Sequence, residues 1–406
     1  MKTSLLAIIS FFLFNSLAMS QQEWLPVTNF PGSPRAWAAT FTIGDRIYIG
    51  TGGVNLSFED DLWEYNTITN TWSQKANFTG LDRTGAVGFS VNGIGYLGLG
   101  TCGFQQQCQD IKSYNPQNNQ WTSVVNNFPA TGVANVSAFT IDNKAYLLTN
   151  GSFAGVGNDS SELWEYTPAT NSLIQKTSLP GLPRNRASSF TLNSKGYIAV
   201  GFHYDGQANA NLKDLWEYNP ITDVWIQRAD YPGLGSTDCI AFSMNGHAYL
   251  GLGYLANTDL WRYDPTMDAW TIMPSFWGAG RIASVSATVG NTGYMGLGYT
   301  TNNTGTVNFN DFWRFQDATL SNESIDKNYQ INTYPNPFTD KIFIELPTFI
   351  ETDVKLDFII YDIKGQIVRK GKLYNATIDL KSLSSGVFIL KCFSRSHDYQ
   401  NVIVKK

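Results

Sequence analysis

The stretch DLWEYNPITDVW, residues 214–225, decides how this chain folds, because close versions of it recur along the sequence. Residues 61–72 read DLWEYNTITNTW, and residues 259–270 read DLWRYDPTMDAW. Weaker versions begin at Asp110 and Glu162, and a sixth, DFWRFQ, begins at Asp311 and stops at Gln316. Copies about 50 residues apart identify a repeat protein in which each unit is one supersecondary structure.

A second recurring segment precedes each copy and has the pattern of two short strands joined by a tight turn. Residues 89–100 read FSVNGIGYLGLG, and residues 242–253 read FSMNGHAYLGLG. Apolar residues alternate with small or polar ones, and the Asn-Gly pairs tolerate the positive φ angles of a hairpin turn. The pattern therefore predicts four antiparallel strands in each unit, called A to D. LWEY is strand C, and a tryptophan is the first residue of strand D.

A four-stranded sheet of this size cannot bury both faces alone, and packing such sheets around a ring covers them all. The glycine-rich end of strand B, the tyrosine of strand C and the tryptophan of strand D resemble the kelch repeat. The chain writes GLG or GTGG where the kelch family usually has a plain Gly-Gly pair, which affects the turn rather than the architecture. The fold class expected is all-β, a six-bladed kelch-type propeller.

The sixth unit lacks its own strand D. The other units supply an anchor for that strand, at Trp72, Trp121, Leu173, Trp225 and Trp270. Around Trp24 the sequence EWLPVTNFPG precedes the first strand A, just as WIQRADYPG at residues 225–233 precedes the fifth. We therefore expect the N-terminal strand to complete the last blade of a propeller spanning residues 21–318.

Residues 1–20 read as a secretory signal, with Lys2, an apolar run, and small residues at Ala18 and Ser20 before a cleavage site. The apolar run is too short to span a membrane comfortably, and no other stretch could, so no transmembrane segment is expected. The net charge is −5, and basic residues concentrate in the C-terminal region, so the propeller is more acidic still. An acidic propeller argues against a nucleic-acid partner.

Residues 331–406, at the C-terminal end, form a second module after a polar linker at residues 319–330. Regular turn signals predict a small β-sandwich. Its motifs are Tyr334-Pro335-Asn336-Pro337, a turn at Gly365, the segment at Gly386, and the basic end Lys405-Lys406. In this order they resemble the type A sorting domain of the type IX secretion system of Bacteroidetes. The resemblance implies that the type IX machinery is a partner, and that the protein passes through the periplasm to be secreted or attached to the cell surface. The alternative is an ordinary accessory sandwich domain.

Two of the four cysteines, Cys102 and Cys108, share one loop of the second unit. In an exported protein this spacing predicts a local disulfide.

Ring symmetry separates expected structure from expected function. An acidic residue precedes strand C in every unit, which favours a structural role: Asp61, Asp110, Glu162, Asp214, Asp259 and Asp311. At the start of strand A an arginine recurs in four units, at Arg35, Arg83, Arg184 and Arg281, with Val133 and Ser236 in the other two. Two residues further on, the side chains differ in every unit: Trp37, Gly85, Asn135, Arg186, Asp238 and Ala283.

In kelch-like rings this segment enters the central channel. We therefore expect the four recurring arginines, with Arg186, Trp37 and Asp238, to rim a funnel that binds an anionic glycan or peptide. Arginine offers a rigid fork of donors for carboxylates. The alternative is that the recurring arginines bond to loop carbonyls and to the acids found in every unit.

The sequence predicts no catalytic residues, no metal and no cofactor. The kelch architecture resembles galactose oxidase, but its copper centre needs two histidines, two tyrosines and a Cys–Tyr crosslink. The histidines here are His203, expected as a solvated loop residue, His247 near the opposite end of the ring, and His397 in the tail. A binding module for a glycan or protein ligand is therefore the first reading. A sialic-acid-type mutarotase or epimerase, needing only an acid–base pair and an arginine, is the alternative. The third interpretation is a structural protein of the cell surface.

Overall fold

The computed structural model describes residues 22–317, except 55–56, 104–105, 131, 150–161, 205–208, 234–236 and 303–304. It also describes residues 332–406, except 346–355, 364, 374–375 and 394–397. The chain divides into a unit Gln22–Gln316 and a C-terminal unit that begins at Asp317. The expected signal segment and linker lie outside the described residues.

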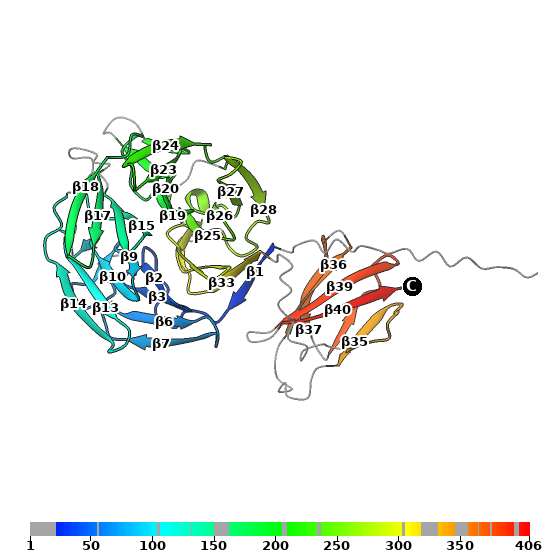
Figure 1. Ribbon diagram of the computed structural model, residues 1–406. Helices are drawn as coiled ribbons and strands as arrows, with labels where there is room; N and C mark the ends of the chain where they lie inside the picture. Colours follow the sequence, from blue (N-terminus) through cyan, green and yellow to red (C-terminus); the bar gives the residue numbers. More distant parts are fainter. Residues whose placement is uncertain are drawn as a thin grey trace, which may run out of the picture. The chain divides into compact units, whose positions relative to one another are not determined.

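Six four-stranded antiparallel sheets form the blades of a ring (Figure 1). The innermost strands contact their neighbours in turn around the channel: β2 (Ala39–Ile43), β9 (Val87–Val91), β15 (Ser137–Ile141), β19 (Ser188–Leu192), β25 (Ile240–Met244) and β29 (Val285–Val289). The second strands are β3 (Arg46–Gly50), β10 (Ile94–Gly98), β16 (Lys144–Leu148), β20 (Lys195–Ala199), β26 (His247–Gly251) and β30 (Thr292–Gly296). The six-bladed propeller expected from the repeats is confirmed.

In each repeat of the DLWEYNPITDVW motif, the first residues form the third strand of the blade. The last residues of the motif begin the outer strand. The third strands are β6 (Leu62–Asn66), β13 (Ile111–Asn115), β17 (Leu163–Thr167), β23 (Leu215–Asn219), β27 (Leu260–Asp264) and β33 (Phe312–Asp317). The outer strands are β7 (Thr71–Lys75), β14 (Gln120–Val125), β18 (Ser172–Lys176), β24 (Val224–Arg228), β28 (Ala269–Met273) and, for blade 6, β1 (Gln22–Val27).

The N-terminal strand closes the ring. The sixth sheet has the order β1-β33-β30-β29, so its outer strand comes from the opposite end of the propeller sequence. Trp24 of β1 is 1% exposed and packs edge-on against Phe242 of blade 5 and against Phe276 of the loop that leads into blade 6. This is the closure that the missing sixth anchor predicts, and it leaves blade 6 complete.

The repeated motif fastens blades 1, 2, 4 and 5 to the blade before each of them. In blade 4, Tyr218 donates to Asp223 at 2.6 Å, and Asp223 accepts the backbone N–H of Thr177 from the end of blade 3. Trp225 donates its indole N–H to the carbonyl of the same Thr177, 2.8 Å away. Blade 1 clamps Thr28 with Trp72 in the same way, and blade 5 clamps Ala229 with Trp270. The phrase is therefore scaffold.

Packing between blades explains a recurring glycine in the second strands. The phenylalanine of strand A stacks on the tyrosine of strand B within a blade, as Phe139 does on Tyr146 at 5.2 Å between ring centres. The next blade lays Gly196 against that phenylalanine, where a Cβ would lie 2.0 Å from the ring of Phe139. Any side chain at residue 196 would separate the two blades.

The C-terminal unit contains two sheets. One has the order β37 (Ile367–Leu373), β36 (Leu356–Asp362), β39 (Gly386–Phe393) and β40 (Asp398–Lys405). The other has the order β34 (Asn332–Tyr334), β35 (Lys341–Glu345) and β38 (Thr377–Asp379). Phe338, Ile360 and Leu390 belong to the one hydrophobic cluster that joins them. This is the expected β-sandwich. Within the described part of the chain, no helix has the length and apolar content to cross a membrane.

Candidate functional site

Six residues with left-handed backbone encircle one mouth of the channel, each two residues before an innermost strand. Their φ angles are 50° at Trp37, 61° at Gly85, 56° at Asn135, 54° at Arg186, 56° at Asp238 and 56° at Ala283. Backbone bonds link them from blade to blade, as from Gly85 N–H to the Trp37 carbonyl and from Asp238 N–H to the Arg186 carbonyl. Five of the six are not glycine, and such conformations persist where the surroundings enforce them, often at binding sites.

Three of these variable side chains meet. Trp37 Nε1 donates to Asp238 Oδ1 at 3.2 Å, although the two residues are 201 apart in sequence. Arg186 Nη1 lies 3.4 Å from Asp238 Oδ2, and its guanidinium lies 5.5 Å from the centre of the Trp37 ring. Blades 1, 4 and 5 thus bring an indole, a guanidinium and a carboxylate together at the channel mouth.

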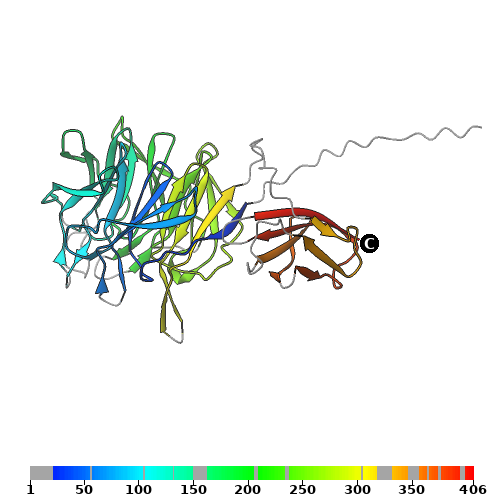
Figure 2. The same cartoon turned by 90° about the horizontal axis from the view of Figure 1, so that it is seen from below.

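A fourth member, Tyr299 of blade 6, was missed by sequence reasoning. Its ring centre lies 5.2 Å from that of Trp37. It opens β31 (Tyr299–Asn302), which pairs with β32 (Gly305–Asn308) as a hairpin that projects from one face of the propeller (Figure 2). The only signal was its place directly after a strand-B glycine motif, where blade 5 also has a tyrosine, Tyr254.

The carboxyl group of Asp238 is the unusual charge of this cluster. Its side chain is 6% exposed, whereas that of Arg186 is 28% exposed. Burial raises the pKa of Asp238, and the neighbouring Arg186 and the Trp37 hydrogen bond only partly oppose that rise. Burial, followed by the charge of Asp238, also raises the pKa of Tyr299. The mouth therefore combines a partly exposed cation with an acid that holds its proton to a higher pH than usual.

The four recurring arginines do not line this mouth, and that part of the sequence prediction is wrong. Arg35, Arg83 and Arg281 are each at most 1% exposed, and Arg184 is 3% exposed. Each pairs with the acid before strand C of its own blade: Arg35 with Asp61, Arg83 with Asp110, Arg184 with Asp214 and Arg281 with Asp311. Each also donates to loop carbonyls, so the alternative interpretation holds, and buried ion pairs tie the loops to the blades.

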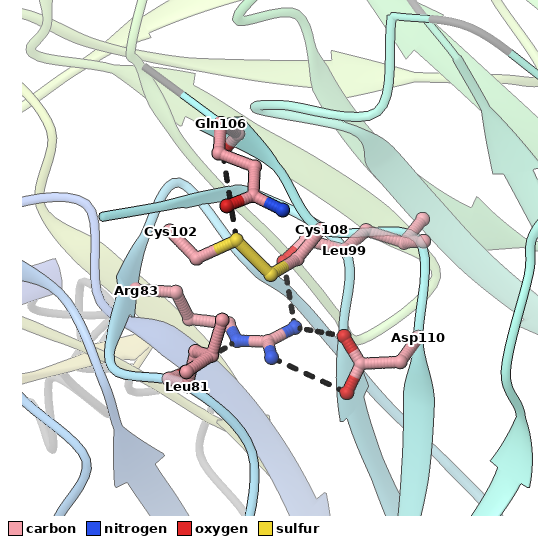
Figure 3. Close-up of a disulfide and its surroundings, with 7 residues drawn as sticks. All are labelled: Leu81, Arg83, Leu99, Cys102, Gln106, Cys108 and Asp110. Atoms are coloured by element: carbon pink, nitrogen blue, oxygen red, sulfur yellow. Dashed lines mark hydrogen bonds and ion pairs between the residues drawn. A yellow bond between two sulfur atoms is a disulfide. The ribbon is translucent and has the colours of Figure 1, made fainter. Parts of the chain in front are cut away.

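Figure 3 shows one of these pairs beside the disulfide of blade 2. Arg83 donates to the carbonyls of Leu81 and Leu99, at 3.0 and 3.1 Å, and pairs with Asp110. A disulfide joins Cys102 to Cys108 with their Cα atoms 5.9 Å apart. It closes the hairpin of β11 (Thr101–Cys102) and β12 (Gln106–Gln107), which pairs with β8 (Arg83–Thr84). The predicted disulfide is thus present, next to a buried arginine.

The loops after the second strands differ from blade to blade. Blade 1 has the short hairpin of β4 (Gly53–Val54) and β5 (Ser57–Phe58), and blade 4 has that of β21 (Phe202–Tyr204) and β22 (Asn209–Asn211). Blade 5 has only the short turn η1 (Tyr254–Ala256). His203 of β21 is 8% exposed, with Nδ1 2.7 Å from the Pro183 carbonyl, so the expectation of a solvated histidine is wrong.

No metal-binding constellation is found among the described residues: no three His, Cys, Asp or Glu side chains lie together in a way that could hold an ion. His247 belongs to β26, and its Nε2 lies 3.7 Å from Oδ2 of Asp264, the last residue of β27. His397 lies outside the described residues.

In the C-terminal unit one motif residue, Asn336, is bonded to strand β40. Asn336 Nδ2 donates to the Val402 carbonyl at 2.7 Å, and its Oδ1 accepts the Val404 N–H at 2.8 Å. Phe338 continues this pairing through the Val404 carbonyl and the Lys406 N–H. Because β40 is an edge strand, residues 336–338 cover the edge that would otherwise be open.

The other motif residues have separate places. Lys405 Nζ donates to the carbonyls of Leu380 and Lys381, at 2.8 and 3.0 Å. Gly365, with a φ of 78°, forms the turn after β36, and Gly386 begins β39. Tyr334 is 54% exposed and stacks on Phe343, while Pro335 and Pro337 flank Asn336.

Comparison with known proteins agrees with both units. The family described as the secretion system C-terminal sorting domain matches residues 332–406. Kelch-like protein 35 of Mus musculus is 23% identical over 217 residues, which is 52% of this chain and 33% of the relative. N-acetylneuraminate epimerase of Pasteurella multocida is 25% identical over 201 residues, 48% of this chain and 46% of the relative. The chain thus spans less than half the length of each of these two relatives.

Among solved structures, that of YjhT superposes with a TM-score of 0.59 at 19% identity, covering 71% of this chain and 97% of that chain. At this identity the likeness shows the fold. The chain is therefore a kelch-type β-propeller followed by a secretion-system sorting domain. That domain indicates export, to the cell surface or the medium, and handling by the type IX machinery.

Proposed function

We propose that the propeller is an exported binding module whose channel mouth takes a carboxylate-bearing ligand. An acidic sugar is the first choice and a carboxylate-bearing peptide the second. Arg186 carries the proposal, because its side chain is 28% exposed and its ion-pair contact with Asp238 is a single one of 3.4 Å. A guanidinium has five N–H donors in a fork that matches a carboxylate, so donors of Arg186 remain for a ligand.

The neighbours of Arg186 suit a sugar. Trp37 and Tyr299 present aromatic rings beside the guanidinium, and both are partly exposed. Apolar surface with a few placed polar groups is the usual composition of a small-molecule site. The sorting domain would deliver this site, through the periplasm, to the cell surface or the medium.

A thermal-shift screen of the full chain tests the proposal. N-acetylneuraminate and glucuronate are compared with neutral N-acetylglucosamine and glucose at matched concentrations. A ligand at about 100 times its Kd stabilises the native state by about 2.7 kcal/mol, which raises the melting temperature visibly. We expect a rise with the carboxylated sugars and none with the neutral ones.

Two arginine variants make the test specific. Arg186→Gln should abolish the rise, whereas Arg46→Gln should keep it. Arg46 is a matched control because its side chain is 29% exposed, against 28% for Arg186, and it follows the turn after β2, away from the mouth cluster. A shift that persists in Arg186→Gln would remove the proposed site. The absence of a shift with every sugar would favour a protein ligand or a structural role.

A mutarotase or epimerase acting on an acidic sugar is the second candidate. It is supported by Asp238, an acid with a raised pKa beside a carboxylate-binding cation, because interconversion of anomers needs an acid and a base at the ring oxygen and the anomeric hydroxyl. Several curated relatives are named N-acetylneuraminate epimerase. NMR exchange between N-acetylneuraminate anomers that is lost in Asp238→Asn, with binding retained, would establish catalysis. Exchange at the uncatalysed rate in the wild-type protein would leave the binding module alone.

A further inference from the structure

Blade 5 breaks the pattern of buried arginine–aspartate pairs. It keeps the acid, Asp259, at the place held by Asp61, Asp110, Asp214 and Asp311. By sequence its residue at the arginine place is Ser236, which lies outside the described residues. Four blades thus neutralise this carboxylate with their own guanidinium, and blade 5 has no arginine in its sequence to do so.

Blade 5 nevertheless has the backbone carbonyl that corresponds to the one accepting a hydrogen bond from the arginine elsewhere. In the four blades that have the arginine, its guanidinium donates to the carbonyl of a left-handed residue that follows strand B: Thr51, Leu99, Val200 and Leu297. Leu252 holds this place in blade 5, with a φ of 56°. The thiol of Cys239 approaches its carbonyl at 3.5 Å, at the outer limit of a weak sulfur hydrogen bond.

Two buried polar atoms at this place have no hydrogen-bond partner among the described residues, Asp259 Oδ1 and the Tyr231 hydroxyl. The other oxygen of Asp259 accepts from Trp261 Nε1 at 3.0 Å. Tyr231 is 1% exposed, and burial raises its pKa, with Cys239 and Asp259 adding smaller contributions. The Tyr231 ring centre lies 6.4 Å from that of Trp261, whose indole N–H donates to Asp259, so the phenol and the carboxylate share this neighbour.

The tyrosine hydroxyl lies where an arginine nitrogen lies elsewhere. Phe30, Phe78 and Phe276 hold the equivalent place in three arginine-bearing blades, each with a guanidinium over its ring. A Cβ built on Gly181 would lie 2.6 Å from Arg184 Nη2, and one built on Gly233 would lie 2.6 Å from the Tyr231 hydroxyl. Blade 5 therefore brings an oxygen to the place where blade 4 brings a cation.

We propose that blade 5 binds a monovalent cation between Asp259 Oδ1, the Tyr231 hydroxyl and the Leu252 carbonyl, where it takes the place of the guanidinium charge. A carboxylate oxygen buried without a compensating charge or hydrogen bond destabilises a fold. All three ligands are oxygen atoms and only one carries a charge. Such a set suits potassium or sodium better than calcium, whose sites use several carboxylates.

The test uses the full chain in tetramethylammonium chloride, a cation too large for such a site. Potassium chloride or sodium chloride then replaces it at constant ionic strength, and the melting temperature is followed. We expect the temperature to rise and to saturate with one of the small cations, by ~2 °C or more. Crystals grown in rubidium chloride should show an anomalous peak beside Asp259 Oδ1.

Three variants isolate the site. Asp259→Asn should lose the cation-dependent rise and the rubidium peak, whereas Asp230→Asn should keep both. Asp230 is a matched control because it is an exposed aspartate in the loop beside Tyr231, and its substitution changes the charge equally. Tyr231→Phe installs the residue that other blades use, so it should fold, and it should raise the half-saturating potassium concentration several-fold.

Identical melting curves in all three cations, with no rubidium peak in the wild-type protein, would overturn the proposal and assign the place to a water molecule. If Asp259→Asn fails to fold, the wild-type peak and the Tyr231→Phe titration decide the matter without it. A rise that Tyr231→Phe leaves unchanged, together with a peak elsewhere, would also overturn this assignment.

Discussion

Trp277 donates its indole N–H to the backbone carbonyl of Trp24, which lies 2.8 Å away and 253 residues earlier in the chain. At the other described tryptophan anchors the bond runs the opposite way, from the blade's own outer strand to the end of the preceding blade, as from Trp72 to Thr28. Trp24 cannot follow that rule, because its own indole N–H is buried and has no hydrogen-bond partner in the described structure. The joint between blades 5 and 6 is thus held by a loop residue, Trp277.

This joint should be the point at which the ring is most easily weakened. Trp24→Ala removes a side chain that is 1% exposed, and we expect a loss of about 3–5 kcal/mol in the free energy of unfolding. Trp277→Phe removes chiefly the hydrogen bond and should cost about 1 kcal/mol. Urea unfolding followed by circular dichroism measures both. If a variant that lacks residues 21–30 were as stable as the full chain, that result would contradict the closure.

Neighbouring arginines should separate stability from binding. Arg184→Met leaves Asp214 buried without its cation, and we expect it to lower the unfolding free energy by about 3–5 kcal/mol without changing ligand affinity where the protein is folded. Arg186→Met should do the reverse, with little loss of stability and loss of the carboxylated-sugar shift. Calorimetric unfolding gives the stability of each variant, and ligand titration gives its affinity. Equal changes in the two variants would refute the assignment of Arg184 to stability and Arg186 to binding.

The same ion pair predicts how stability depends on pH. Burial acts to raise the pKa of Asp214, but the hydrogen bonds and charge of Arg184 outweigh it and hold the pKa below its usual value of 3.8. A carboxyl with a lower pKa in the folded state stabilises the fold above its unfolded pKa, and that contribution is lost as the pH falls. The stability gap between wild type and Asp214→Asn should therefore shrink below about pH 4. Urea midpoints from pH 3 to 7 measure it, and a constant gap is the contrary result.

At the channel mouth the sign is opposite. Burial raises the pKa of Asp238, and an anion bound to Arg186 would raise it further, so binding takes up protons. Affinity for a carboxylated ligand should fall as the pH rises through the pKa of Asp238 in the free protein. Titration calorimetry in two buffers of different ionisation enthalpy detects the proton. Asp238→Asn should abolish the uptake, and uptake that survives this change would point to another group.

Asn336 should govern the edge of the sorting domain. Asn336→Ala removes the two bonds that cover Val402 and Val404 of β40, and we expect faster amide exchange at Val404 and a stability loss of about 1–3 kcal/mol. Tyr334→Ala is the control in the same motif, because Tyr334 is 54% exposed and should leave Val404 protected. Unchanged exchange in Asn336→Ala would show that the edge is protected by other contacts.

The architecture could be predicted because the same local sequence pattern recurs in six units. Strand order, the tight turns and the missing sixth anchor all follow from comparing units, and the N-terminal strand follows from counting them. The four recurring arginines were misplaced for a physical reason. Their direction depends on an acid about thirty residues away, as in Arg184 with Asp214, and that contact is not local.

The mouth cluster was predicted only in part. Trp37, Arg186 and Asp238 stood out because their positions differ from unit to unit in an otherwise regular ring. Their meeting could not be inferred, since Trp37 and Asp238 belong to blades 1 and 5 and touch only across the channel. Tyr299 lacked any motif, and its role emerges only from the hairpin that carries it.

Ring closure also sets an order of events for the growing chain. Phe30 and Asn310 exchange backbone and side-chain hydrogen bonds across a separation of 280 residues. The first strand of the propeller must therefore wait for its last strand, and loop-closure entropy opposes such distant pairings until many other contacts exist. During synthesis the chain is an open arc with two unfinished ends. Completion of the circle is then a late step, and a chain truncated before it keeps an unpaired strand edge.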